Sequence, residues 1–113
     1  MKVGRTFHFD ASHFIPQHKG ACKQLHGHTY TLEVVIESSV KKDGMVVDFA
    51  ILKQIVEEHV LAKLDHSSLN DLFENPTAET IVEWIAQQLK GKLPLHSIKL
   101  WEGTGKWEEK TIE

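Results

Sequence analysis

The 113-residue sequence contains a single cysteine, no long apolar run and no large excess of charge of either sign. One cysteine cannot form an internal disulfide, so we expect a reducing, cytoplasmic environment. No apolar stretch approaches the roughly 18 residues that a membrane-spanning helix needs, and the first residues resemble a strand rather than a signal peptide. A net charge of −3 argues against a general affinity for nucleic acids or anionic membranes.

The length fits one domain, residues 1–113, without repeats or linkers. Asp48 is a candidate N-cap for one helix, and Asn75-Pro76-Thr77 and Gly91 are typical of the start and end of another. Apolar periodicity predicts strands over 3–13, 26–36, 96–102 and 106–112, a helix from 49 to about 64, a second helix between Asn75-Pro76-Thr77 and Gly91, and a polar loop over 65–71. The order ββααββ predicts an α+β fold, an antiparallel four-stranded sheet with two helices on one face.

The edges of such a sheet need protection from unwanted pairing. The final predicted strand is short and charged, which blunts an edge. The long second strand, 26–36, is therefore the better candidate for pairing with another subunit. Closure of several sheets into a barrel removes free edges, so we expect a homo-oligomer.

Three histidines share one face of the predicted first hairpin. Side chains two apart on a strand point the same way, so His13 ends the apolar row of the first strand, and His26 and His28 begin that of the second. An unpaired imidazole is costly to bury, but one metal ion satisfies all three. Zinc bound by three protein ligands keeps an open position, as in catalytic sites. The alternative is that His-Gly-His is a tight strand start with hydrogen-bonded histidines.

Cys22 precedes this pair and allows three interpretations. It is a small buried hydrophobe, or a fourth ligand that closes a structural zinc site, or a thiolate base or nucleophile favoured by a nearby cation such as zinc or Lys23. The preceding Gly20-Ala21 indicates a loop, which weakens the first interpretation.

Two further acidic positions stand out. Asp65-His66 after the first helix is either a helix-terminal histidine with a solvated aspartate, or a proton-transfer pair in which the carboxylate fixes the imidazole tautomer. Glu102 shares a face with Ile98 and Leu100, so it is either an inward carboxylate that pairs with adjacent N–H donors of a ligand, or a residue exposed at a strand end.

Together these residues resemble the 6-pyruvoyl-tetrahydropterin synthase / 6-carboxytetrahydropterin synthase family. The matching elements run through the chain in family order: Phe9-Asp10-Ala11-Ser12-His13, Cys22-x3-His26-Gly27-His28, Val47-Asp48-Phe49, Leu64-Asp65-His66-x2-Leu69-Asn70, Asn75-Pro76-Thr77-Ala78-Glu79 and Glu102. Ser12 stands where alanine is common, and the stretch after Glu102 is variable.

The resemblance implies the tunnelling fold, in which trimers build a shared β-barrel and stack into hexamers. It implies zinc on His13, His26 and His28, with Cys22 as the catalytic base. Asp65 and His66 would complete the proton relay from a neighbouring subunit. Glu102 would anchor a pterin ring, with Thr77 and Glu79 near it.

The three residues between Cys22 and His26 resemble the carboxy-forming branch of the queuosine and archaeosine pathways. The expected activity is that of a lyase acting on 7,8-dihydroneopterin triphosphate. Pyruvoyl-forming synthases usually have a longer gap, and a third branch, which forms 6-hydroxymethyl-dihydropterin, replaces the cysteine with glutamate. Lys19, Lys23 and Lys106 are candidate triphosphate contacts on charge alone. The alternatives are a pyruvoyl-forming synthase and, in another class, a non-catalytic zinc-stabilised pterin-binding module.

Overall fold

The two longest strands form one antiparallel pair. In the computed structural model, which describes residues 1–113, β1 (Lys2–His13) and β2 (His26–Glu37) are paired over all 12 residues of each. Their apolar rows face the same side, where Phe9 and Tyr30 lie opposite each other and stack with ring centroids 4.8 Å apart. The predicted alternation of these two strands is therefore confirmed.

Three shorter strands complete a five-stranded sheet in the order β3-β1-β2-β4-β5. They are β3 (Ser67–Ser68), β4 (Leu95–Glu102) and β5 (Trp107–Thr111). β4 pairs antiparallel with β2, and β5 pairs antiparallel with β4. The outer positions leave β5 and most of β1 as free edges.

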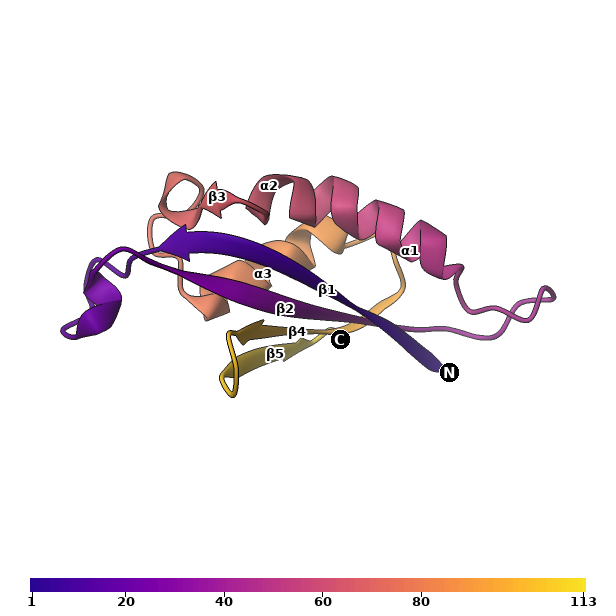
Figure 1. The fold of residues 1–113 in the computed structure, drawn as a ribbon. Coiled ribbons are helices and arrows are strands. Elements are labelled where there is room, and N and C mark those ends of the chain that lie inside the picture. Colours follow the sequence, from indigo (N-terminus) through magenta and orange to yellow (C-terminus); the bar gives the residue numbers. More distant parts are fainter.

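The helices all lie on one face of the sheet (Figure 1). They are α1 (Phe49–Val56), a π-helical turn (Glu57–Leu61), α2 (Ala62–Leu64) and α3 (Ala78–Leu89). Two 3-10 turns lie at Leu69–Asp71 and, beyond the end of β1 and β2, at Ala21–Lys23. The apolar faces of the helices and the inner face of the sheet enclose one core of 22 buried residues. The α+β class with helices on one face is confirmed.

Side-chain caps and a glycine set the helix ends. Asp48 Oδ1 accepts the Ala50 N–H at 2.8 Å, and Thr77 Oγ1 accepts the Thr80 N–H at 3.2 Å. Gly91 follows α3 with φ +78°, a left-handed conformation that glycine adopts without a steric penalty.

The π-helical turn joins α1 and α2 into one nearly continuous helix. Leu52, Val56, Val60 and Leu64 repeat every fourth residue, and all are fully buried. Because an α-helix has about 3.6 residues per turn, a strict four-residue repeat drifts around the helix. A wider turn in the middle counteracts that drift and keeps the row on the core.

Two predictions about the sheet are wrong. The sheet has five strands rather than four, because part of the predicted polar loop, Ser67–Ser68, pairs in parallel with Ala11–Ser12 at the outer edge of β1. The second strand is also not free for a partner, since β1 and β4 occupy both of its edges. A two-residue strand is too short to leave a periodic pattern in the sequence.

Asp65 and His66 hold this short strand against β1. Asp65 Oδ1 accepts the Asp10 N–H at 3.0 Å, and the His66 N–H donates to the Asp10 carbonyl at 2.7 Å. His66 has φ +59°, the only positive φ outside glycine, and this reverses the chain so that β3 runs along β1. The Asp10 N–H, followed by the His66 side chain, holds the pKa of Asp65 below its ordinary value.

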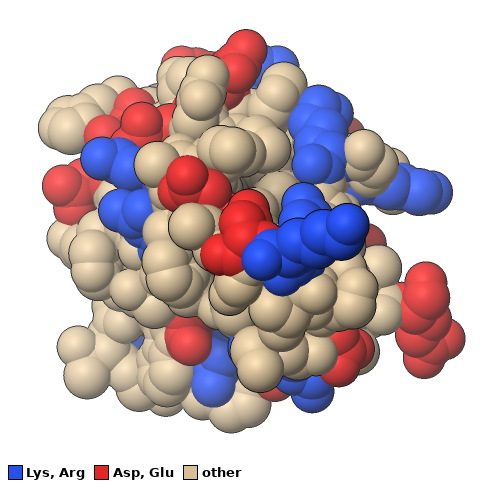
Figure 2. Space-filling view, turned by 90° about the vertical axis from the view of Figure 1, so that its right-hand side faces the viewer, with Lys and Arg blue, Asp and Glu red and all other residues tan.

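The molecule is elongated, with principal extents of 53 × 23 × 23 Å. The 14–25 loop and the loop after β2 extend from opposite ends (Figure 1). None of the helices is long and apolar enough to span a bilayer. On the face that carries the N-terminus, acidic and basic side chains are mixed (Figure 2).

The lowered pKa of Asp65 predicts a pH-dependent contribution to stability. A carboxylate with a depressed folded-state pKa stabilises the fold above its unfolded pKa, and this stabilisation is lost as pH falls through the folded pKa. Asp65→Asn should therefore unfold at a lower urea concentration than wild type at pH values well above 3.8, the ordinary aspartate pKa. The difference should shrink as the pH falls below that value.

Urea unfolding curves at about pH 7 and about pH 3 test this. Asp71→Asn, an exposed aspartate in the following 3-10 turn, is the control. A difference of equal size at both pH values would mean that the charge of Asp65 does not stabilise the fold.

Candidate metal centre and active site

The register of β1 and β2 brings three imidazoles together at one end of the sheet. His13 lies directly opposite His26, and His28 lies opposite Ala11, so all three rings share the core face. Their ring centroids are 4.7 to 5.1 Å apart. One nitrogen from each lies within 4.8 Å of the others, which is close enough for one metal ion to contact all three.

Main-chain carbonyls orient two of these rings. His13 Nδ1 lies 2.8 Å from the Pro76 carbonyl, and His26 Nδ1 lies 2.6 Å from the Gln24 carbonyl. A carbonyl only accepts, so each Nδ1 carries the proton and each Nε2 presents a lone pair. A backbone carbonyl is a common partner for the other nitrogen of a metal-bound histidine.

Two buried nitrogens of the cluster lack hydrogen-bond partners. His13 is 1% exposed, and the Nε2 atoms of His13 and His28 are buried without a hydrogen bond. His28 Nε2 is 3.2 Å from Glu102 Oε1, but the contact lacks hydrogen-bond geometry. A buried polar atom without a partner costs about 1–3 kcal/mol. The donor set therefore fits a metal ion that accepts nitrogen lone pairs.

The charge state of His28 is consistent with this. Burial lowers its pKa, and the neighbouring His13 and His26 lower it further, against an opposing effect of Glu102. A neutral imidazole is the form that binds metal.

A cavity of about 170 Å³ lies beside this cluster. Four of the predicted site residues reach it together with His13, from the 14–25 loop, the start of α3 and the end of β4. Its lining residues are His13, Ile15, His18, Cys22, Thr77, Ala78, Glu79, Glu102 and Glu108. Residues distant in sequence therefore meet at one cavity.

Cys22 and Glu102 occupy different positions in it. Cys22 is partly buried in the 3-10 turn and does not belong to the three-histidine group. Glu102 has a side chain that is only 18% exposed, with Oε1 4.0 Å from Lys106 Nζ. Glu102 therefore points inward, as expected from the strand face that it shares with Ile98 and Leu100.

Asp65 and His66 do not line this cavity. His66 Nδ1 is 3.0 Å from Asp65 Oδ1, and the His66 side chain is 80% exposed. His66 borders a shallow hollow on the outer side of β1 and β2, together with Asp10, Gly27 and Thr29. We call the cavity lined by Cys22, Glu102 and His13 the Cys22 cavity. Within one chain, Asp65 and His66, the pair predicted to relay protons, lie outside it.

Glu108 is the main cavity residue that sequence reasoning missed. The charged composition of the final predicted strand does not indicate which of its side chains face the core. Its pairing places Glu108 opposite Leu100 and therefore on the core side. The alternation of side chains, counted through the Gly103–Gly105 turn, would have assigned Glu108 to the same face as Leu100. His18 and Ile15, in the 14–25 loop, had no periodic pattern that would identify them.

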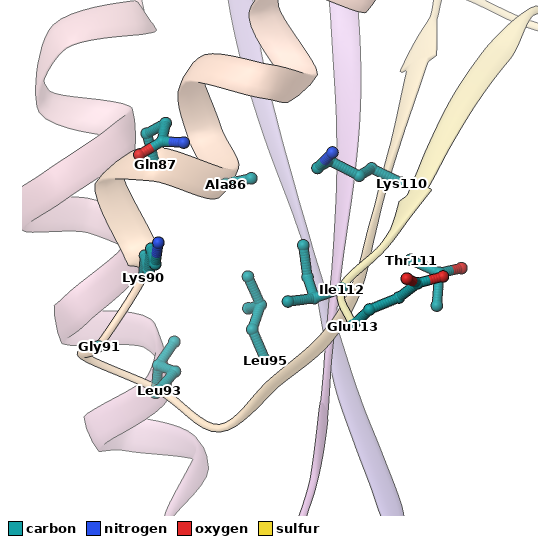
Figure 3. Close-up of a pocket in the computed structure, with 10 residues that line it drawn as sticks. All are labelled: Ala86, Gln87, Lys90, Gly91, Leu93, Leu95, Lys110, Thr111, Ile112 and Glu113. Carbon is teal, nitrogen blue, oxygen red and sulfur yellow. The ribbon is translucent and has the colours of Figure 1, made fainter.

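A larger hollow of about 510 Å³ lies elsewhere, between the end of α3 and β5 (Figure 3). Its charged side chains are Lys90, Lys110 and Glu113, and it contains no histidine or cysteine. Size alone does not make it the site, because groups for metal binding or proton transfer gather at the smaller cavity.

Comparison with known proteins shows which family the chain belongs to. The family model described as "6-pyruvoyl tetrahydropterin synthase" matches residues 2–111. A Pyrococcus furiosus protein named dihydroneopterin monophosphate aldolase is 43% identical over 99 residues, 84% of this chain and 83% of its own. A Synechocystis protein named 6-carboxy-5,6,7,8-tetrahydropterin synthase is 39% identical over 109 residues, 88% of this chain and 84% of its own.

A solved structure is also similar. The 6-pyruvoyl tetrahydropterin synthase of Caenorhabditis elegans superposes with a TM-score of 0.83 at 21% identity, covering 100% of this chain and 96% of the other. This likeness supports the fold, and the sequence matches support the family. The chain belongs to the 6-pyruvoyl tetrahydropterin synthase family of enzymes.

Proposed function

We propose that this protein is a zinc-dependent lyase that converts 7,8-dihydroneopterin triphosphate and one water to 6-carboxy-5,6,7,8-tetrahydropterin, acetaldehyde and triphosphate. The observation that carries the proposal is the single cavity that Cys22 and Glu102 share with His13 of the histidine cluster. The Cys22-x3-His26 spacing and the name of the Synechocystis relative support the carboxy-forming branch. The product would enter queuosine or archaeosine synthesis.

Zinc is the proposed metal because three neutral imidazoles are a common zinc ligand set. His13, His26 and His28 would hold it. When bound, zinc polarises hydroxyl oxygens and stabilises the negative charge that develops on them as protons leave. The Cys22 thiol stands outside the three-histidine group, which supports its use in proton transfer rather than in ligation.

The chain's own residues would then hold the substrate and move its protons. Glu102 would accept N–H groups of the pterin ring and fix its orientation, with Thr77 and Glu79 beside it. Cys22, as thiolate, would remove a proton from the substrate's side chain. Lys19, Lys23 and Lys106 remain candidates for the triphosphate, on charge alone.

The proton relay would come from a second copy of the chain. Asp65 and His66 lie outside the Cys22 cavity of their own chain, so a neighbouring subunit would supply them. His66, oriented by Asp65, would exchange protons on the side of the substrate opposite Cys22. This arrangement requires a homo-oligomer, which we propose to be built from trimers and to be hexameric, in the cytoplasm.

The same site could carry out two other reactions. Elimination of triphosphate without carbon–carbon cleavage gives 6-pyruvoyl-tetrahydropterin. The Pyrococcus furiosus relative favours a second candidate, aldol cleavage of dihydroneopterin monophosphate. That reaction leaves a 6-hydroxymethyl pterin and glycolaldehyde phosphate.

Product analysis by mass spectrometry distinguishes these reactions. The zinc-loaded protein is incubated separately with the triphosphate and the monophosphate of dihydroneopterin. We expect 6-carboxytetrahydropterin and acetaldehyde from the triphosphate only. A pyruvoyl product, or cleavage of the monophosphate alone, would overturn the proposed reaction. No turnover of either substrate, with zinc held by Cys22, would favour the non-catalytic binding module.

Loss of one imidazole should remove the metal. His28→Ala leaves two histidines and should lose nearly all zinc on dialysis, because affinity depends on the full ligand set. His8→Ala is the matched control, since His8 is an exposed residue on the opposite face of β1. Metal content by atomic emission measures both. Full zinc occupancy in His28→Ala would contradict the ligand assignment.

Cys22→Ala should keep zinc and the fold but lose turnover. A positioned base contributes about 10²–10⁴-fold to a proton-transfer step, so kcat should fall by at least about 10²-fold. Turnover and zinc content are measured on the same preparation. Departure of zinc together with the thiol would instead identify Cys22 as a ligand.

A further inference from the structure

Two side chains of β5, those of Glu108 and Lys110, point toward the first turns of α3. Glu108 and Lys110 are two apart on the strand and point the same way, as Glu79 and Glu83 do one turn apart on the helix. Lys110 Nζ and Glu83 Oε1 form an ion pair at 3.1 Å. Beside this ion pair, Glu108 and Glu79 line the same cavity, and both are acids. An ion pair of opposite charges therefore lies beside two acidic side chains that cannot pair with each other as ions.

Glu108 has no partner for its inner oxygen. Its Oε2 is buried and makes no hydrogen bond, although Glu108 lies opposite Leu100, a position that folding alone would fill with an apolar side chain. Burial, then Glu79 and Glu102, raise the pKa of Glu108, and Lys106 opposes them. Nothing in the fold itself accounts for an acid here.

These two acids, Glu79 and Glu108, line the cavity beside the histidine cluster. The ionisable groups around Glu108 come from every neighbouring element: His13 (β1), His18 and Cys22 (14–25 loop), Tyr30 (β2), Glu79 (α3), Glu102 (β4) and Lys106 (the turn before β5). Of these, His13 is 1% exposed and also has a buried nitrogen without a partner. The same cavity is thus lined by two groups without partners: a metal ion would satisfy His13, and Glu108 is left for a ligand bound in the cavity.

We propose that Glu108 is a second ring-positioning residue, which binds the pterin as a neutral carboxyl group while Glu102 binds it as a carboxylate. This inference rests on the proposed function, because it takes a pterin as the ligand. Glu102 offers two acceptors, which suit the adjacent N3–H and 2-amino donors. A neutral carboxyl offers one donor and one acceptor, which suit N1 and a neighbouring N–H of the same ring.

Titration of pterin into the zinc-loaded enzyme, followed by fluorescence, tests the assignment. Glu108→Met keeps the length of the side chain but removes both hydrogen bonds, so the Kd should rise about 10- to 100-fold. Glu108→Gln retains a donor and an acceptor and should stay within about threefold of wild type. Glu102→Gln, in contrast, turns an acceptor toward the ring's donors into a donor and should weaken binding about 10- to 100-fold.

Thermal unfolding without pterin separates a binding role from a structural one. Removing a poorly solvated carboxyl group should raise the melting temperature of Glu108→Met above that of wild type, while its pterin affinity falls. Glu109→Met is the matched control, because Glu109 is the next residue on the exposed face of β5. It should bind pterin as wild type does.

Each outcome decides one point. Weak binding by Glu108→Gln, equal to that of Glu108→Met, would overturn the neutral-carboxyl assignment. Wild-type affinity in Glu108→Met, or a lower melting temperature with unchanged affinity, would overturn any positioning role. Neither result affects the proposed lyase if wild type binds pterin and forms the product. If wild type binds no pterin at all, the proposed function itself fails.

Discussion

The register between β1 and β2 is the constraint on which the site depends. A slip of one residue would turn every side chain of a strand to the opposite face, and with it the three imidazoles. Burial of the opposed apolar rows, such as Phe9 against Tyr30, penalises such a slip. The hydrophobic core therefore positions His13 opposite His26, although neither imidazole contributes to that core.

The energetic cost of the site is concentrated at one end of the molecule. The buried side-chain atoms without hydrogen bonds are His13 Nε2, His28 Nε2 and Glu108 Oε2. Elsewhere the core is apolar, apart from Ser97. Since folding favours satisfied polar groups, three exceptions gathered in one place are better explained by ligands than by packing. A metal ion would satisfy the two nitrogens, and an N–H-rich ring would satisfy the carboxyl group.

Long periodic segments were predictable from the sequence, and short irregular ones were not. Twelve-residue strands carry enough alternation to assign the faces of His13, His26 and His28, and capping residues marked both helix starts. The β3 strand has two residues, and the left-handed conformation of His66 depends on tertiary contacts with Asp10. Glu108 was missed because its face follows from pairing with β4, and the polar composition of β5 concealed that pairing.

The separation of Asp65 and His66 from the Cys22 cavity bears on how subunits would associate. β2, predicted as the joining strand, is unavailable because its hydrogen-bonding edges are both occupied. The free backbone groups lie along β1, outside its short contact with β3, and along β5. His66 sits next to the first of these edges, since its own N–H bonds Asp10 of β1. A second copy that pairs along β1 would therefore meet the acid–base pair at the same edge. Edge pairing and a shared active site would then have one structural cause.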